Sequence, residues 1–144
     1  SSTNTLIQPW IVEDHDTFRR SLQRLCTAER GLATAPAFAN AESMLAVLQR
    51  VTDDQKPDVL LLDVGLPGRS GLEIIADVHK HAPQCRIVIL TVFEDEDKIS
   101  RAISAGASAV IYGGVEAAGL VRLATGRRCE DDARNRDSHV RIVR

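Results

Sequence analysis

Short runs of apolar residues alternate along this chain with longer segments whose apolar residues recur at helical spacing. This alternation limits the fold more than any other feature, because short apolar runs predict strands and the longer segments predict helices. The predicted strands span residues 6–12, 32–38, 58–63, 86–92 and 107–112. The predicted helices begin near Asp16, after Asn40, after Gly71 and after Phe93, and a fifth spans residues 115–125. Repeated strand–helix units predict an α/β fold in which helices cover both faces of a parallel sheet.

Details within these segments predict where each strand lies. Residues 59–62 read VLLL, and a continuous apolar run is typical of a central strand that is buried on both faces. Pro36 places the second strand at an edge, because proline has no amide hydrogen to donate to a neighbouring strand. For the same reason Pro9 marks where pairing of the first strand begins. Asn40 is a suitable N-cap for the second helix.

Composition agrees with one soluble domain. The chain has 144 residues, of which 44% are hydrophobic and 26% charged, and its net charge of −2 gives no general attraction to nucleic acid or to an anionic membrane. No apolar run approaches the roughly 20 residues that span a bilayer. Residues 1–5 do not have the layout of a signal peptide, so a cytoplasmic location is expected.

The C-terminal segment differs from the rest of the chain. Residues 127–144 contain six arginines and four acidic residues among few apolar ones. We therefore expect residues 1–126 to form the folded domain and residues 127–144 to form a polar, flexible tail. Because acidic residues are interspersed with the arginines, a solvated tail is favoured over a nucleic-acid contact surface.

The cysteines do not form a pattern. Cys26, Cys85 and Cys129 are far apart and odd in number, which argues against a disulfide framework or a zinc site. Cys26 and Cys85 are expected to be small buried apolar residues.

Acidic residues follow the predicted strands at the positions where such sheets bind ligands. In open parallel sheets, ligands bind beyond the carboxyl ends of the strands. Glu13 and Asp14 end the first strand, Asp63 ends the third and Thr91 ends the fourth. Carboxylates that converge there repel one another unless a cation joins them, and an all-oxygen site suits Mg²⁺. The alternative is that these acids only end strands in solvent.

Two motifs identify a family. Residues 11–15 read IVEDH and residues 58–73 read DVLLLDVGLPGRSGLE. From about residue 7 to residue 107, the chain resembles the receiver domains of two-component response regulators, most closely the NarL/FixJ group that usually precedes a LuxR-type DNA-binding domain. The resemblance implies a flavodoxin-like, doubly wound, five-stranded parallel sheet of order 2-1-3-4-5.

The resemblance also implies roles for individual residues. Asp63 would be the nucleophile that takes a phosphoryl group from a phosphohistidine of a sensor histidine kinase. Asp14, Asp63 and the backbone carbonyl of Gly65 would bind Mg²⁺ directly, and Glu13 would contact it mainly through water. The hydroxyl of Thr91 would donate to a phosphoryl oxygen. The chain would be no enzyme beyond its own phosphorylation and dephosphorylation.

The same resemblance implies partners. The kinase would dock on the first helix, at residues 16–29, and phosphorylation could produce a homodimer. Control of transcription would need an absent or separate output domain, since no helix-turn-helix follows in these 144 residues. Direct nucleic-acid binding and membrane association by this chain are not expected.

The fifth strand departs from the family pattern. Gly113 stands where a lysine is expected, and Val110 stands where an aromatic switch residue is expected, unless a slipped register brings Tyr112 into that role. These differences predict that Asp63 still accepts phosphate while the conformational response is weakened. Residues beyond 107 match the family poorly, which fits either a divergent end or an altered reading of a longer gene.

Two other functions are weighed against the phosphorylation-controlled receiver. An atypical receiver could act as a phosphorylation-independent docking module through its fourth helix, fifth strand and fifth helix. A phosphatase of the haloacid-dehalogenase kind also has an aspartate after an apolar strand. Such enzymes need a second acid two residues later, where this chain has Gly65.

Overall fold

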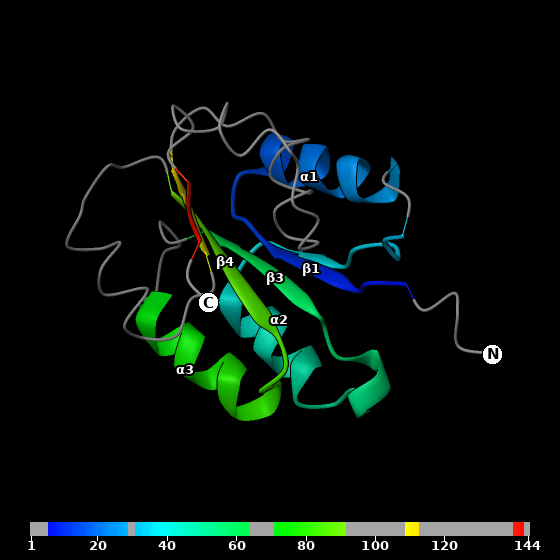
Figure 1. Ribbon diagram of the computed structural model, residues 1–144, viewed down its shortest axis with the longest axis vertical. Helices are drawn as coiled ribbons and strands as arrows, with labels where there is room; N and C mark the ends of the chain where they lie inside the picture. Colours follow the sequence, from blue (N-terminus) through cyan, green and yellow to red (C-terminus); the bar gives the residue numbers. More distant parts are fainter. Residues whose placement is uncertain (1–5, 29–30, 64–70, 92–108, 113–139, 143–144) are drawn as a thin grey trace.

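The fold is a twisted sheet between two layers of helices (Figure 1). The computed structural model describes residues 6–28, 31–63, 71–91, 109–112 and 140–142. The sheet has the order β2-β1-β3-β4-β5-β6. Its strands are β1 (Pro9–Val12), β2 (Ala37–Phe38), β3 (Val59–Asp63), β4 (Arg86–Thr91), β5 (Ala109–Tyr112) and β6 (Val140–Ile142). The first five strands pair in parallel in the predicted order 2-1-3-4-5, so the predicted doubly wound α/β fold is confirmed.

The described helices cover both faces of this sheet. They are α1 (Asp16–Ala28), α2 (Ala41–Leu48) and α3 (Gly71–His81), with a short 3₁₀ helix, η1 (Asp53–Gln55). In Figure 1, α1 lies on one face and α2 and α3 lie on the other. The helices predicted after Phe93 and at 115–125 lie outside the described residues.

Alternate residues of the central strands pack into two separate apolar clusters. On the face covered by α2 and α3, Leu60 and Leu62 of β3 pack with helix residues such as Met44 and Ile75. On the opposite face, Leu61 packs with residues of α1 and of the neighbouring strands. A fully buried Leu or Ile contributes about 1.5–3 kcal/mol relative to an exposed one. Strand β3 is thus buried on both faces, as its apolar run predicts.

Local sequence signals account for several element boundaries. Strand β1 begins at Pro9, and β2 lies at the edge of the sheet, as predicted. The prediction that the second strand spans residues 32–38 is wrong, because β2 begins directly after Pro36, which has no amide hydrogen to donate. Asn40 caps α2, because its side-chain oxygen accepts a hydrogen bond of 2.8 Å from the amide of Ser43. These signals fix how the chain enters and leaves the sheet.

One expectation about the number of strands needs correction. Strand β6 pairs antiparallel with β5, so residues 140–142 of the predicted tail form a sixth strand of the sheet. The apolar residues Val140 and Ile142 permit this pairing, although arginines surround them. The boundary at residue 126 stays a prediction, since residues 113–139 lie outside the described part of the chain. In α1, Leu22 and Cys26 are buried, whereas Phe18 in the first turn is 39% exposed.

Two smaller expectations concern cysteines and membranes. Cys26 and Cys85 are buried and not in a disulfide, as expected. Burial raises the pKa of the Cys26 thiol to about 11, which keeps it protonated near neutral pH. Among the described residues, no helix is both long enough and apolar enough to span a bilayer.

Candidate functional site

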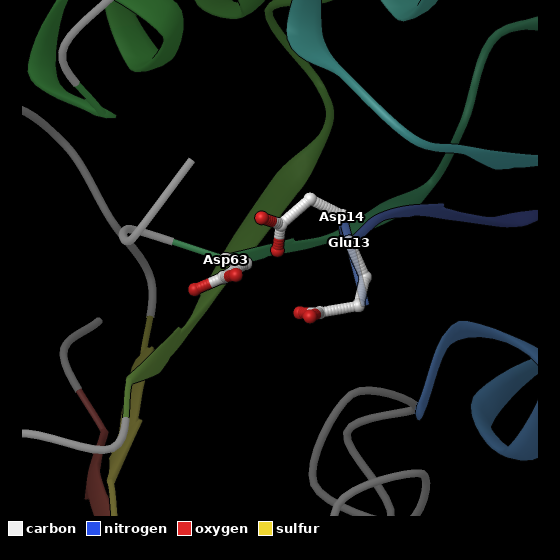
Figure 2. Close-up of side chains that lie close together, drawn as sticks. All are labelled: Glu13, Asp14 and Asp63. Atoms are coloured by element: carbon white, nitrogen blue, oxygen red, sulfur yellow. The ribbon is translucent and has the colours of Figure 1, made fainter. Parts of the chain in front are cut away.

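The carboxyl ends of β1 and β3 bring three acidic residues together. These strands are parallel neighbours, and their register pairs Val12 with Leu62. Glu13 and Asp14 directly follow the end of β1, while Asp63 is the last residue of β3. Because the paired residues are level, the next residues of both strands emerge at the same edge of the sheet. Figure 2 shows the three side chains directed toward one region beyond the strand ends.

The distances confirm the predicted convergence. One carboxylate oxygen from each of Glu13, Asp14 and Asp63 lies within 4.8 Å of the others. Glu13 is buried at 5% exposure, Asp63 is half-buried and Asp14 is exposed. Glu13 is therefore not an acid that ends a strand in solvent, since it is buried and faces another carboxylate.

Burial and like charge alter the ionisation of this cluster. The pKa of Glu13 is raised to about 7, first by desolvation and then by repulsion from Asp63. A hydrogen bond with Asp63 and the charge of Asp14 raise it further, while a hydrogen bond from the backbone of His15 lowers it. Without a cation, the cluster keeps its negative charge low by holding a proton on Glu13.

The donor set suits a hard divalent cation. All the side chains offer carboxylate oxygens, which are the ligands that Mg²⁺ and Ca²⁺ prefer. Glu13 is a buried carboxyl that holds a proton near neutral pH. A cation that binds this cluster would displace that proton. Asp63 and Asp14 could supply direct ligands, and Glu13 lies close to both at the sheet edge. The backbone carbonyl of Gly65, the fourth predicted ligand, lies outside the described residues.

A network of hydrogen bonds holds the turn from β1 into α1. The amide of His15 donates to Oε1 of Glu13 at 3.2 Å, and the amide of Glu13 donates to the carbonyl of Phe38 in β2 at 3.0 Å. The amide of Phe18 donates to Nδ1 of His15 at 3.4 Å, so the histidine side chain caps α1. The Glu13 side chain and its backbone are thus both fixed.

Arg19 is a residue of this site that the sequence analysis did not find. It stands in the second turn of α1, and its Nη1 lies 2.9 Å from the carbonyl oxygen of Glu13 and 3.5 Å from that of Asp14. Arg19 falls within residues 16–29, the helix on which a sensor kinase was expected to dock. In the sequence, Arg19 follows the acidic pair by a short loop and about one helical turn. Many surface arginines have such a spacing, so it does not by itself indicate a residue of the site.

The described backbone also places Thr91 near the site. Asp63 pairs with Leu90 across β3 and β4, so Thr91, the last residue of β4, stands one position beyond Asp63 at the same edge. Its backbone pairs with Tyr112 of β5. Val110 pairs with Ile89 on one side and with Arg141 of β6 on the other, and Gly113 lies outside the described residues.

Comparison with known families gives a match that covers most of the chain. Residues 10–124 match the family described as the response regulator receiver domain. The match continues past residue 107, beyond which the sequence was expected to fit the family poorly, and it includes β5. The family match therefore extends beyond residue 107, while the poor fit expected for that stretch stays a prediction.

Individual proteins agree with this match. The DNA-binding transcriptional activator DevR/DosR of Mycobacterium tuberculosis is 32% identical over 117 residues, which make up 81% of this chain and 52% of that protein. The chain spans about half the length of the first curated relatives that it matches.

Solved structures share the fold. A CheY-like receiver domain protein from Methanospirillum hungatei superposes with a TM-score of 0.74 at 22% identity, covering 85% of this chain and 93% of the other. A response regulator from Burkholderia pseudomallei, solved with a phosphorylated aspartic acid, a calcium ion and citrate, gives 0.72 at 19% identity over 91% of this chain and 71% of its own. At such identities, the likeness shows the fold alone.

Proposed function

The chain belongs to the response regulator receiver domain family, and from that premise we propose that Asp63 is its phosphoryl acceptor. The convergence of Glu13, Asp14 and Asp63 within 4.8 Å is the observation that most strongly supports this role. Asp63 ends a buried central strand, so its carboxylate has a fixed position, yet it is only half-buried and remains accessible. A phosphorylated aspartic acid in the Burkholderia pseudomallei response regulator also supports the assignment.

The proposed step is a phosphoryl transfer. A carboxylate oxygen of Asp63 forms a bond to the phosphorus of a phosphohistidine, and the bond from that phosphorus to the imidazole nitrogen breaks. The imidazole leaves with the bonding electron pair. Apart from this transfer and the hydrolysis of the resulting acyl phosphate, we propose no enzymatic activity for the chain.

We propose Mg²⁺ as the cation of this site, with Asp14, Asp63 and the carbonyl of Gly65 as direct ligands and Glu13 linked through water. A bound Mg²⁺ would neutralise charge on the phosphoryl oxygens during transfer. The calcium ion in the Burkholderia pseudomallei structure agrees with a divalent cation without selecting magnesium. Thr91 would donate its hydroxyl to a phosphoryl oxygen from the end of β4.

Partners and output are proposed from the same family. A sensor histidine kinase would supply the phosphoryl group in the cytoplasm, through the surface of α1, and homodimers would form only a minor fraction of the phosphorylated protein. Several relatives are transcription regulators, and one is a DNA-binding activator, so the output of this receiver would be transcriptional. We place the chain in the NarL/FixJ group on its sequence motifs, and we propose that an output domain, rather than the receiver, contacts DNA.

Mass spectrometry tests the acceptor directly. With Mg²⁺ and acetyl phosphate, the wild-type protein should gain about 80 Da, the mass of one phosphoryl group. The Asp63→Asn variant should not gain it. Asp58→Asn is the matched control, because it changes an aspartate at the opposite end of the same strand, and it should be phosphorylated normally. A modified Asp63→Asn variant, or an unmodified wild type, would contradict the proposal and favour the phosphorylation-independent docking module.

The response to phosphorylation should be weak. Gly113 and Val110 replace the lysine and the aromatic residue that normally help to stabilise the active state. The phosphorylated protein should therefore show little change in apparent size by gel filtration. A complete shift from monomer to dimer would show that this part of the proposal is wrong.

A further inference from the structure

Arg19 joins helix α1 to the backbone that carries the acidic pair. Its Nη1 donates to the carbonyl of Glu13 at 2.9 Å and approaches the carbonyl of Asp14 at 3.5 Å. Its Nη2 forms an ion pair with Asp16 at the start of the helix. The Arg19 side chain is only 17% exposed, which is low for an arginine on a helix that faces solvent.

Hydrogen bonds from two sides hold the backbone of Glu13 in place. The amide of Glu13 is held from the sheet side by the carbonyl of Phe38, and its carbonyl is held from the helix side by Arg19. The Glu13 and Asp14 side chains are attached to this backbone segment, so its position sets the direction in which both carboxylates point. On the premise of the proposed metal site, we propose that Arg19 is a positioning residue that sets the geometry of the acidic pair for the cation.

The ion pair with Asp16 does not explain why Arg19 is held in place. The Asp16 side chain is 73% exposed, and exposed pairs contribute little to stability because water screens them. Arg19 also lowers the pKa of Asp16, through a side-chain hydrogen bond and its positive charge. The contact with the Glu13 carbonyl is part-buried and therefore better shielded from water. A planar guanidinium can reach the carbonyls and Asp16 together, whereas a lysine ammonium cannot match that geometry.

Charge and position predict opposite effects on cation binding. Arg19 carries a positive charge close to a site that binds a positive ion. If Arg19 acted only through its charge, its removal would relieve repulsion and tighten cation binding. If Arg19 positions the acidic pair, its removal loosens the ligands and weakens binding despite the lost repulsion. The sign of the change therefore distinguishes the two roles.

The experiment measures binding of Mn²⁺, a spectroscopic substitute for Mg²⁺, by electron paramagnetic resonance of the free ion. Arg19→Ala should weaken binding about tenfold, the effect expected for the loss of one well-placed ligand contact. Arg19→Lys should weaken binding several-fold, because lysine keeps the positive charge but lacks the planar guanidinium. Arg24→Ala is the matched control, since it removes an exposed arginine from the same helix, and its affinity should stay within about twofold of wild type.

Each result supports or overturns the inference. Near-UV circular dichroism establishes that each variant is folded at the temperature of the titration. If folded Arg19→Ala binds Mn²⁺ as tightly as wild type or more tightly, the inference is overturned even if the variant melts earlier. If Arg19→Ala does not fold, Arg19→Lys decides by the same criterion.

The proposed metal site has a separate control. Wild-type protein should bind Mn²⁺, and Asp14→Asn should lose that binding. If both hold while Arg19 variants bind normally, only the inference fails. If the wild type does not bind Mn²⁺, the metal site itself fails, and the role of Arg19 fails with it.

Discussion

The two ends of strands β1 and β3 both carry carboxylates, but their surroundings differ. At the amino end, Oδ2 of Asp58 accepts a hydrogen bond of 2.8 Å from the amide of Gln8, and the amide of Asp58 donates to the carbonyl of Gln8 at 2.8 Å. The carbonyl of Asp58 also accepts from the amide of Arg86 at 2.9 Å. Asp58 therefore connects three adjacent segments through hydrogen bonds.

At the carboxyl end, three carboxylates face one another. Glu13 accepts one backbone hydrogen bond, from His15, but desolvation and repulsion still raise its pKa to about 7. The amino end thus uses a carboxylate to satisfy backbone donors, which stabilises the fold. The carboxyl end keeps repulsion that costs stability, and such cost is typical of a site arranged for a ligand.

Truncation of a core side chain in β3, the strand that runs between the two ends, should have the largest effect. Leu61 is fully buried between Asp58 and Asp63, so Leu61→Ala should lower the free energy of unfolding by about 2–5 kcal/mol. Urea denaturation measures this change. A loss below about 1 kcal/mol would mean that β3 does not connect the two ends through a packed core.

Neutralisation at the carboxyl end should stabilise the metal-free protein. Folding raises the pKa of Glu13 from 4.5 to about 7, so the folded state binds more protons than the unfolded state between these values. The free energy of unfolding should therefore fall as pH rises through this window and stay low above it. Glu13→Gln should remove this loss and stabilise the protein by on the order of 1–2 kcal/mol at about pH 8 in EDTA.

Denaturation at several pH values measures this difference. Near pH 4, where Glu13 is protonated in both states, the variant should have no such advantage. A variant less stable than wild type at about pH 8 would contradict the account of repulsion at this end.

Removal of the carboxylate at the amino end should have the smallest effect and the opposite sign. Asp58→Ala loses the acceptor for the Gln8 amide at an exposed position, so stability should fall by about 0.5–1 kcal/mol. Mn²⁺ affinity should not change, because the site lies at the far end of the strand. Chemical denaturation and a metal titration check both statements, and an altered metal affinity would mean that the two ends are coupled.

Most of the fold could be predicted because its signals are local. The apolar run of residues 59–62 predicts a central strand, and Pro36 and Asn40 mark an edge strand and a helix cap. Strand β6 was missed since it depends on pairing with β5 and has only two apolar residues within a segment rich in arginine. Pairing between distant segments leaves little trace in a short polar stretch.

The candidate site could be predicted in part for a similar reason. Glu13, Asp14 and Asp63 follow strands, and parallel strands bring their carboxyl ends to one edge. Arg19 could not be found this way, because its contacts are with backbone carbonyls, which every residue has. The half-buried position that distinguishes Arg19 from Arg24 is set by the turn after β1 and has no signature in residue type.

Thermal unfolding at about pH 8 with and without Mg²⁺ tests the claim that the three carboxylates form one cation site. Millimolar Mg²⁺ should raise the melting temperature of the wild type by several degrees, whereas Asp14→Asn and Asp63→Asn should show little or no rise. Asp58→Asn should respond to Mg²⁺ as the wild type does. Equal melting temperatures of the wild type in Mg²⁺ and in EDTA would contradict the account.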